Sequence, residues 1–124
     1  MSRRATNPPS APPLTPAVFH VLLALAHGEQ HGYAIMQGVR ESTQGAIKMG
    51  PGTLYGTIKR LLAAGWIEEC ESRLDPEVDD ERRRYYRLSG QGRRALEAEA
   101  RRYEAIVRAT RSRGILPGTA AVTT

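Results

Sequence analysis

One side of the segment 52–63 combines small and basic side chains at the spacing of a helix surface. Its apolar residues recur at i, i+4, i+7 and i+8 and predict a buried face: Leu54, Ile58, Leu61 and Leu62. The opposite face is small and then basic: Gly52, Thr53, Gly56, Lys59, Arg60 and Ala63. Such a face fits the major groove of DNA, about 12 Å wide, with short side chains near base edges and cations on phosphates.

Two neighbouring features extend this predicted surface. Tyr55 flanks the face with a hydroxyl that can donate to a phosphate oxygen. Gly56 lies inside the predicted helix, where glycine costs about 1 kcal/mol relative to alanine, and this indicates close approach of another backbone. The alternative is that Gly56 packs against a neighbouring helix while Lys59 and Arg60 form a solvated face. The residues predicted to lie near or in the major groove are Lys48, Thr53, Tyr55, Gly56, Thr57, Lys59 and Arg60.

Three helices followed by a two-stranded ribbon would position this face. Thr15 is the predicted N-cap of the first helix, with Pro16 at its first position. Gly65 stands where a left-handed residue ends the third helix. Helices are expected from 16 to about 28, from about 31 to about 42 and from 52 to 64, and strands over 66–71 and 83–88. This order predicts a mainly α fold with a small β-wing, a winged helix-turn-helix over residues 14–88.

The predicted wing carries two blocks of opposite charge. The chain has a formal net charge of +5 and an isoelectric point of about 9.9, yet eight of its 13 acidic side chains lie between residues 68 and 81. The rest is therefore strongly basic, which favours a polyanionic partner, although codon bias towards arginine is an alternative. We expect the carboxylates at 79–81 to pair with the wing arginines until DNA displaces them. The wing residues predicted to contact DNA are Arg82, Arg83 and Arg84.

A final helix, capped by Ser89, carries a seam that needs a partner helix. The seam residues are spaced 4, 3, 4 and 3 apart, which is a heptad-like pattern. Because the seam holds few large aliphatic side chains, we expect the apolar first helix to complete the interface of a homodimer. Residues 89–113 are the predicted C-terminal dimerisation helix. The predicted dimerisation residues are Phe19, Leu22, Leu23, Leu96, Ala100, Tyr103, Val107 and Thr110.

The two ends of the chain and its cysteine content bear on the compartment. Residues 1–13, rich in proline, and residues 114–124 are predicted to be a flexible N-terminal arm and a flexible tail. The longest apolar run, residues 17–26, is ten residues, against about 20 for a membrane span. The start of the chain does not lead into an apolar signal core. With Cys70 as the one cysteine, we expect a reducing, cytoplasmic location and no membrane partner.

Several short motifs follow one another in a characteristic order. They are His31-Gly32-Tyr33; Gly52-Thr53-Leu54-Tyr55 with Lys59-Arg60-Leu61 and Gly65-Trp66-Ile67; and Arg84-Tyr85-Tyr86-Arg87-Leu88-Ser89 with Gly92. In this order and spacing, over roughly residues 14–110, the chain resembles the PadR family of bacterial transcriptional regulators. The single helix after the wing resembles the short subgroup of that family. The resemblance implies a dimeric repressor, dimerised through its first and last helices and released from operator DNA by small aromatic or drug-like ligands.

The chain departs from the family pattern in three places. Gly56 stands where the family often has proline, and the acidic insertion in the wing is longer than expected. The only tryptophan, Trp66, begins a strand and does not lie in the last helix, so a ligand site lined by tryptophan does not carry over. The expectation of a small aromatic effector therefore rests on the family resemblance as a whole.

Metal and enzyme chemistry fit the residues less well. His27 and His31 flank Glu29, but in a zinc-protease helix the glutamate directly follows the first histidine, and Gly28 is expected to end a helix here. No Ser/His/Asp or Cys/His arrangement and no phosphate-binding loop is present. We predict no metal site, no cofactor and no enzymatic activity.

Three further alternatives concern binding. Cys70 is either a redox sensor or an inert small apolar residue. Tyr85, Tyr86 and Tyr103 either line an aromatic ligand pocket or belong to the core. The strongest alternative to a DNA-binding regulator is a winged-helix module that binds other proteins and no nucleic acid.

Overall fold

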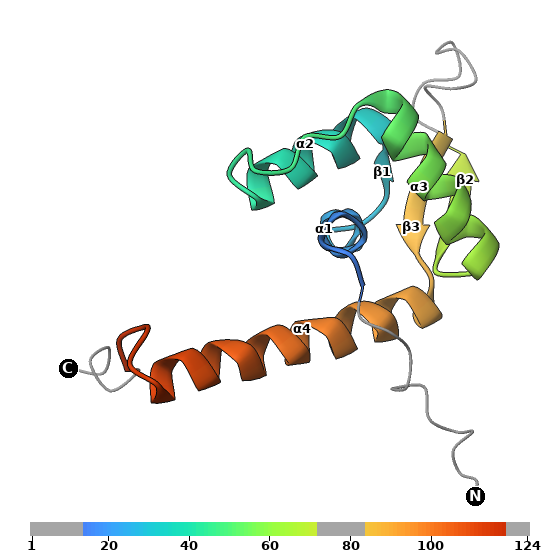
Figure 1. The fold of residues 1–124 in the computed structure, drawn as a ribbon. Helices are drawn as coiled ribbons and strands as arrows, with labels where there is room; N and C mark the ends of the chain where they lie inside the picture. Colours follow the sequence, from blue (N-terminus) through green and yellow to red (C-terminus); the bar gives the residue numbers. More distant parts are fainter. Residues whose placement is uncertain (1–13, 72–83, 119–124) are drawn as a thin grey trace, which may run out of the picture.

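Four helices and three short strands make up the part of the chain that this computed structural model describes, residues 14–71 and 84–118 (Figure 1). In chain order they are α1 (Pro16–Leu25), β1 (Gln30–His31), α2 (Gly32–Ser42), α3 (Pro51–Ala64), β2 (Ile67–Glu71), β3 (Arg84–Leu88) and α4 (Gly90–Ser112). The strands form one antiparallel sheet in the order β1-β3-β2. The predicted mainly α fold with a small β-wing is confirmed.

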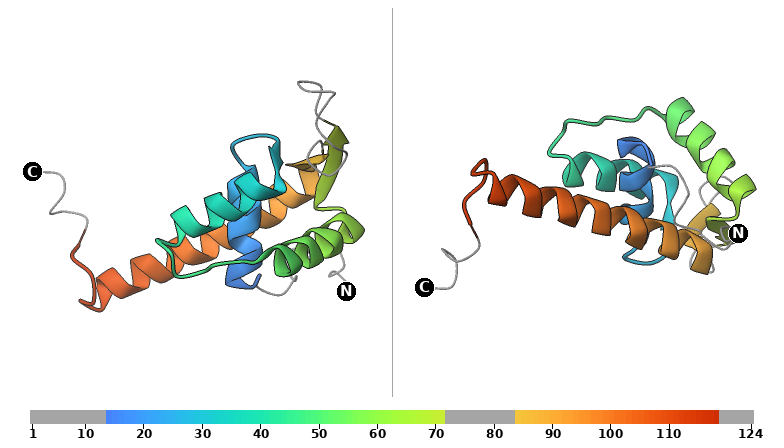
Figure 2. Two further views of the ribbon diagram at one scale, coloured as in Figure 1. Left: turned by 90° about the horizontal axis from the view of Figure 1, so that it is seen from above. Right: turned by 60° about the horizontal axis from the view of Figure 1, so that its bottom comes forward.

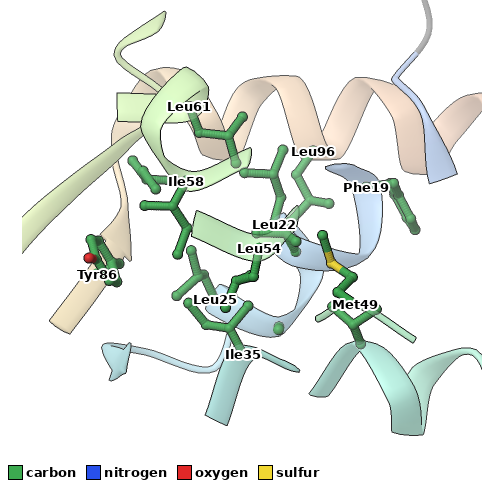
Figure 3. Close-up of a cluster of buried hydrophobic side chains, with 14 residues drawn as sticks. Phe19, Leu22, Leu25, Ile35, Met49, Leu54, Ile58, Leu61, Tyr86 and Leu96 are labelled. Atoms are coloured by element: carbon green, nitrogen blue, oxygen red, sulfur yellow. The ribbon is translucent and has the colours of Figure 1, made fainter. Parts of the chain in front are cut away.

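Helix α1 lies at the centre of the fold, between α2, α4 and the layer formed by α3 and the sheet (Figure 1). Its Val21 and Leu22 side chains are fully buried, and Leu25 is 1% exposed. This central position explains why α1 is apolar on nearly every side. Helix α3 turns its predicted apolar face onto the same core (Figure 3), with these residues buried: Leu54, Ile58 and Leu61. The opposite face of α3 is left at the surface.

The predicted caps fix the ends of the helices. Thr15 Oγ1 accepts a hydrogen bond from the backbone N–H of Val18 at 3.2 Å at the start of α1. Gly65 ends α3 with a φ of 81°, in the left-handed region. Ser89 Oγ accepts from Gly92 N at 3.0 Å and donates to the carbonyl oxygen of Gly65 at 2.6 Å. One hydroxyl therefore caps α4 and ties it to the end of α3.

Because Ser89 makes both of these bonds, we expect Ser89→Ala to lower the free energy of unfolding by about 1–2 kcal/mol. Urea denaturation followed by circular dichroism measures this change. Ser112→Ala is the matched control, since Ser112 Oγ only donates to Ala109 O at the exposed end of α4. Equal losses in the two variants would contradict the capping role of Ser89.

The sheet has one strand more than the sequence predicted. β2 and β3 form the expected antiparallel ribbon, but β1 also pairs with β3, with Gln30 opposite Tyr86. The Gln30 Nε2 donates to the carbonyl oxygen of Ala24 at 2.8 Å, which holds β1 against the end of α1. A strand of two residues shows no alternation of apolar and polar side chains, so periodicity does not detect it.

Helix α4 extends well beyond the rest of the fold (Figures 1 and 2). Its first half packs on the core, where Leu96 and Glu99 are buried. Its second half is exposed, including Ile106 at 56% and Val107 at 37%. None of the helices within residues 14–71 and 84–118 is long and apolar enough to cross a membrane.

The first residues of the predicted tail turn back onto the end of α4. The backbone N–H of Ile115 donates to the carbonyl oxygen of Thr110 at 2.8 Å, and Arg111 Nε donates to the carbonyl oxygen of Pro117 at 2.9 Å. The structure thus describes the chain as far as residue 118, five residues past the predicted end of the dimerisation helix.

Partial burial of His20, on α1, gives the stability a pH dependence. His20 Nδ1 lies 2.7 Å from Ser42 Oγ, and partial burial lowers the pKa of His20 from its usual 6.5. The unfolded chain then binds this proton more readily than the folded chain. We expect the free energy of unfolding to fall as the pH drops below about 6.5, and to be unaffected by this group at higher pH. Urea unfolding at about pH 7.5 and about pH 5.5 measures the difference, which should shrink in His20→Gln.

Candidate nucleic-acid interface

The outer face of α3 is open and carries unpaired positive charge. Lys59 and Arg60 are exposed, and in the described part of the chain neither forms an ion pair with a carboxylate. Thr53 is exposed one turn earlier. A Cβ placed on Gly56 would meet only Arg60 Nη1, at 3.9 Å. No neighbouring helix among the described residues therefore accounts for the glycine, and this face is free for an external partner.

Thr57 does not lie on this face, which corrects its predicted place near the major groove. Its side chain is buried, and Thr57 Oγ1 donates to the carbonyl oxygen of Thr53 at 2.9 Å. The same oxygen accepts from Arg60 Nη2 at 3.3 Å. Thr57 follows Leu54 by three residues and precedes Leu61 by four, a spacing that puts it on the buried face. Thr57 therefore orients Arg60 from the inner side of the helix.

Thr57→Val keeps the shape of this side chain and removes the acceptor that holds Arg60. Because Arg60 then samples more rotamers, we expect affinity for a bound DNA duplex to fall about threefold. Fluorescence anisotropy with a labelled duplex measures this loss. In an Arg60→Gln background the same substitution should have no further effect, and a full additional loss there would contradict the proposed link.

Lys48 and Tyr55, two further residues predicted to contact DNA, are also exposed. Lys48 is exposed in the segment before α3, and the Tyr55 side chain is 45% exposed. Both side chains are available to an external partner.

At the base of the wing the charges are paired. Arg84 Nε lies 3.3 Å from Glu69 Oε2, and Arg87 contacts Glu68 at 3.0 Å and Glu29 at 3.7 Å. The hydrogen bond that Arg87 Nε donates to Glu68 Oε1 raises the pKa of Arg87. Exposed ion pairs of this kind contribute little to stability, so Arg84 can exchange Glu69 for a phosphate at little cost. Arg82, Arg83 and the carboxylates of Asp79, Asp80 and Glu81 lie outside the described residues.

Three of the predicted dimerisation residues belong to the core of a single chain. Leu22 is fully buried, and Leu96 and Phe19 are 6% and 9% exposed. Leu22 and Leu96 face the other helices of the same chain, so they offer no surface to a second copy. Their place in the predicted interface is corrected. An apolar side chain looks the same in the sequence whether its own chain or a partner covers it.

The other predicted dimerisation residues reach the surface of α1 and α4. Tyr103 packs edge-on against Phe19, with ring centroids 4.8 Å apart, and is 36% exposed. Ile106, at 56% exposed, lies beside this seam and was not among the predicted residues. Its spacing of three from Tyr103 would have revealed it. The predicted residues that stay at least partly exposed are Leu23, Ala100, Tyr103, Val107 and Thr110.

Comparison with known proteins identifies the family to which this chain belongs. The family model described as "Transcriptional regulator PadR-like family" matches residues 21–98, a span that holds all of α2, α3, β2 and β3. The chain belongs to the PadR-like family. The protein is thus a transcriptional regulator rather than an enzyme, and the family resemblance noted in the sequence is confirmed.

Two relatives of this PadR-like protein differ in length. A transcriptional regulator of Mycobacterium tuberculosis is 37% identical over 89 residues, which cover 72% of this chain and 77% of that protein. An uncharacterised 37.1 kDa protein from a transposon of Streptomyces fradiae is 40% identical over 80 residues, 64% of this chain and 21% of that protein. The second protein is thus much longer than the matched region.

Solved structures share the PadR-like fold. A PadR family regulator from Clostridium difficile matches with a TM-score of 0.66 and 23% identity, over 79% of this chain and 97% of that one. Bacillus subtilis PadR in complex with operator DNA matches with a TM-score of 0.55 and 21% identity, over 64% of this chain and 44% of that one. These likenesses confirm the winged-helix fold.

Two residues considered for other chemistry have structural explanations in the PadR-like chain. His31 Nδ1 accepts from the backbone N–H of Ala34 at 3.2 Å and so caps α2. Among the described residues no group of three or more His, Cys, Asp or Glu side chains is placed to hold a metal. Burial and then the charge of Glu29 raise the pKa of the Cys70 thiol, which lowers its thiolate fraction. A raised pKa disfavours a redox-sensing role for Cys70.

The three tyrosines considered for a ligand pocket face different surroundings. Tyr86 is 4% exposed within the core. Tyr85 packs edge-on against His31, with ring centroids 5.5 Å apart, whereas Tyr103 of α4 packs against Phe19 of α1. These side chains belong to separate packing clusters, so they do not form one aromatic pocket in the single chain.

Proposed function

We propose that this PadR-like regulator represses transcription by binding a near-palindromic operator as a homodimer in the cytoplasm. The outer face of α3 enters the major groove, with Thr53 near base edges and Lys59 and Arg60 on phosphates. Repression is favoured over activation because a dimer that occludes a promoter needs no further partner surface. Wing contacts from Arg82, Arg83 and Arg84 are part of the proposal.

The open, unpaired cationic face of α3 is the observation that supports this proposal most directly. Within the described residues Lys59 and Arg60 have no acidic partners, whereas the arginines at the wing base are paired, so the charge on the face of α3 is available to phosphates. A related fold is seen bound to operator DNA in Bacillus subtilis PadR. Exposed apolar residues on α4 support the homodimer: Tyr103, Ile106 and Val107.

Salt dependence of DNA binding tests the proposal. Duplexes selected by the full chain from a random pool serve as probes, and their affinity is measured by anisotropy at about 50–200 mM salt. The logarithm of affinity should fall linearly with the logarithm of salt, with a slope of about −0.9 per phosphate contact. Footprints should show two half-sites about 34–36 Å apart. A flat salt response would favour the protein-interaction module instead.

Release by a small aromatic ligand is proposed on the family resemblance. Simple phenols and planar aromatic cations added to the DNA complex should lower the anisotropy of the labelled duplex. Probes that leave the complex unchanged at saturating concentration would remove effector release from the proposal without affecting DNA binding.

A further inference from the structure

The motifs at the start of α2 and near the start of α3 meet at one contact. Gly32, the first residue of α2, is buried beneath the side chain of Tyr55. A Cβ built on Gly32 would collide with Tyr55 Oη and would lie 2.8 Å from Cζ and 3.2 Å from Cε1. The backbone of Gly32 does not adopt a positive φ. Any larger residue at this position would therefore displace the Tyr55 side chain, so the glycine is explained by the space that Tyr55 occupies and not by the backbone conformation.

The hydroxyl held in this way is available to an external acceptor. Tyr55 is 45% exposed, and within residues 14–71 and 84–118 its hydroxyl makes no hydrogen bond. The other exposed tyrosine nearby, Tyr33, instead accepts from Gln37 Nε2 at 3.3 Å. Tyr55 also precedes Lys59 by four residues, so the two side chains are neighbours on the surface of α3. The Tyr55 hydroxyl, a hydrogen-bond donor, is thus a neighbour of the unpaired cation of Lys59.

We propose that Gly32 is a positioning residue for DNA binding, because it allows Tyr55 to lie against α2 with its hydroxyl directed to a phosphate oxygen beside Lys59. This inference rests on the proposed function. A side chain already held in its bound position loses little conformational freedom on binding, so the hydrogen bond contributes more of its energy to affinity. In this chain the first motif supplies the space that the tyrosine of the second fills.

The experiment compares Tyr55→Phe, Gly32→Ala and the double variant in the full chain, with the duplex selected by the unaltered protein as the probe. Tyr55→Phe should lose about tenfold in affinity, as expected for one hydrogen bond to a charged group. Gly32→Ala should lose a similar factor because its methyl group displaces the hydroxyl. The double variant should bind no more weakly than Tyr55→Phe, since the same hydrogen bond is lost.

The salt slope separates this contact from the neighbouring cation. Tyr55 is neutral, so Tyr55→Phe should leave the slope of log affinity against log salt unchanged, whereas Lys59→Gln should reduce it by about 0.9 for each chain. Gly90→Ala is the matched control. Gly90 is also the first residue of a helix, and a Cβ there would meet only Arg94 Nη1 at an ordinary 3.6 Å. Its affinity for DNA should stay unchanged.

Folding of Gly32→Ala is tested by thermal unfolding beside Gly32→Ala/Tyr55→Ala. If the single variant is destabilised, removal of the ring should restore its unfolding temperature, and failure of this rescue would overturn the assigned contact. Unchanged affinity in Tyr55→Phe, or additive losses in the Gly32→Ala/Tyr55→Phe variant, would also overturn the inference. Failure of the unaltered chain to select any duplex would instead refute the proposed function.

Discussion

Replacing Lys59 and Arg60 together by glutamine is expected to lower affinity for the selected duplex by about 100-fold and to reduce the salt slope by about 1.8 for each bound chain. Both side chains are exposed and free of acidic partners in the described structure, so their charge is available for phosphates. Within residues 14–71 and 84–118, the one side-chain hydrogen bond that is lost joins Arg60 to Thr57. The fold should therefore persist, and anisotropy at several salt concentrations measures a loss at the interface.

The matched control removes the same charge from another surface. Arg101 and Arg108 are exposed on α4, on the side away from Tyr103 and Val107, so Arg101→Gln/Arg108→Gln also lowers the net charge by two. We expect this variant to bind nearly as tightly as the unaltered chain. Equal losses in the two double variants would mean that overall charge, and not the face of α3, drives binding.

Local signals in the sequence were sufficient to predict the helices and most of their ends, although α1 ends at Leu25, before its predicted end near residue 28. Thr15, Gly65 and Ser89 occupy the predicted cap positions because capping depends on a few adjacent residues. The buried face of α3 followed from the helical spacing of its apolar side chains. The open face opposite was a consequence of the same periodicity, and this is why the sequence identified most of the candidate site.

The features that the sequence did not reveal depend on contacts between distant segments. β1 consists of two residues and exists because β3 lies beside it. Leu22 could not be assigned to core or interface from its type alone. Thr57 was predictable in principle, since it shares the helical face of Leu54 and Leu61, but a hydroxyl at a buried position gives no apolar signal. The contact between Gly32 and Tyr55 needs the packing of two helices.

The second large effect is expected when aspartate replaces Ile106 and Val107 on the projecting half of α4. These side chains are 56% and 37% exposed in the single chain, on the same side as Tyr103, and the proposed homodimer would cover them. Two carboxylates in each chain would then be desolvated at the interface, at a cost of several kcal/mol per unpaired charge. The variant should be monomeric by sedimentation velocity at concentrations where the unaltered chain is dimeric.

Loss of the dimer should also appear in DNA binding. A monomer contacts one half-site, so the salt slope should fall by about half and affinity by more than 100-fold, because the second half-site no longer binds as part of the same particle. Ala105→Asp is the control, since Ala105 is exposed on the opposite side of α4 and should leave the dimer intact. If Ile106→Asp/Val107→Asp and Ala105→Asp form dimers of equal stability, the interface lies elsewhere. If the unaltered chain sediments as a monomer even on its operator, the two-fold arrangement itself is ruled out.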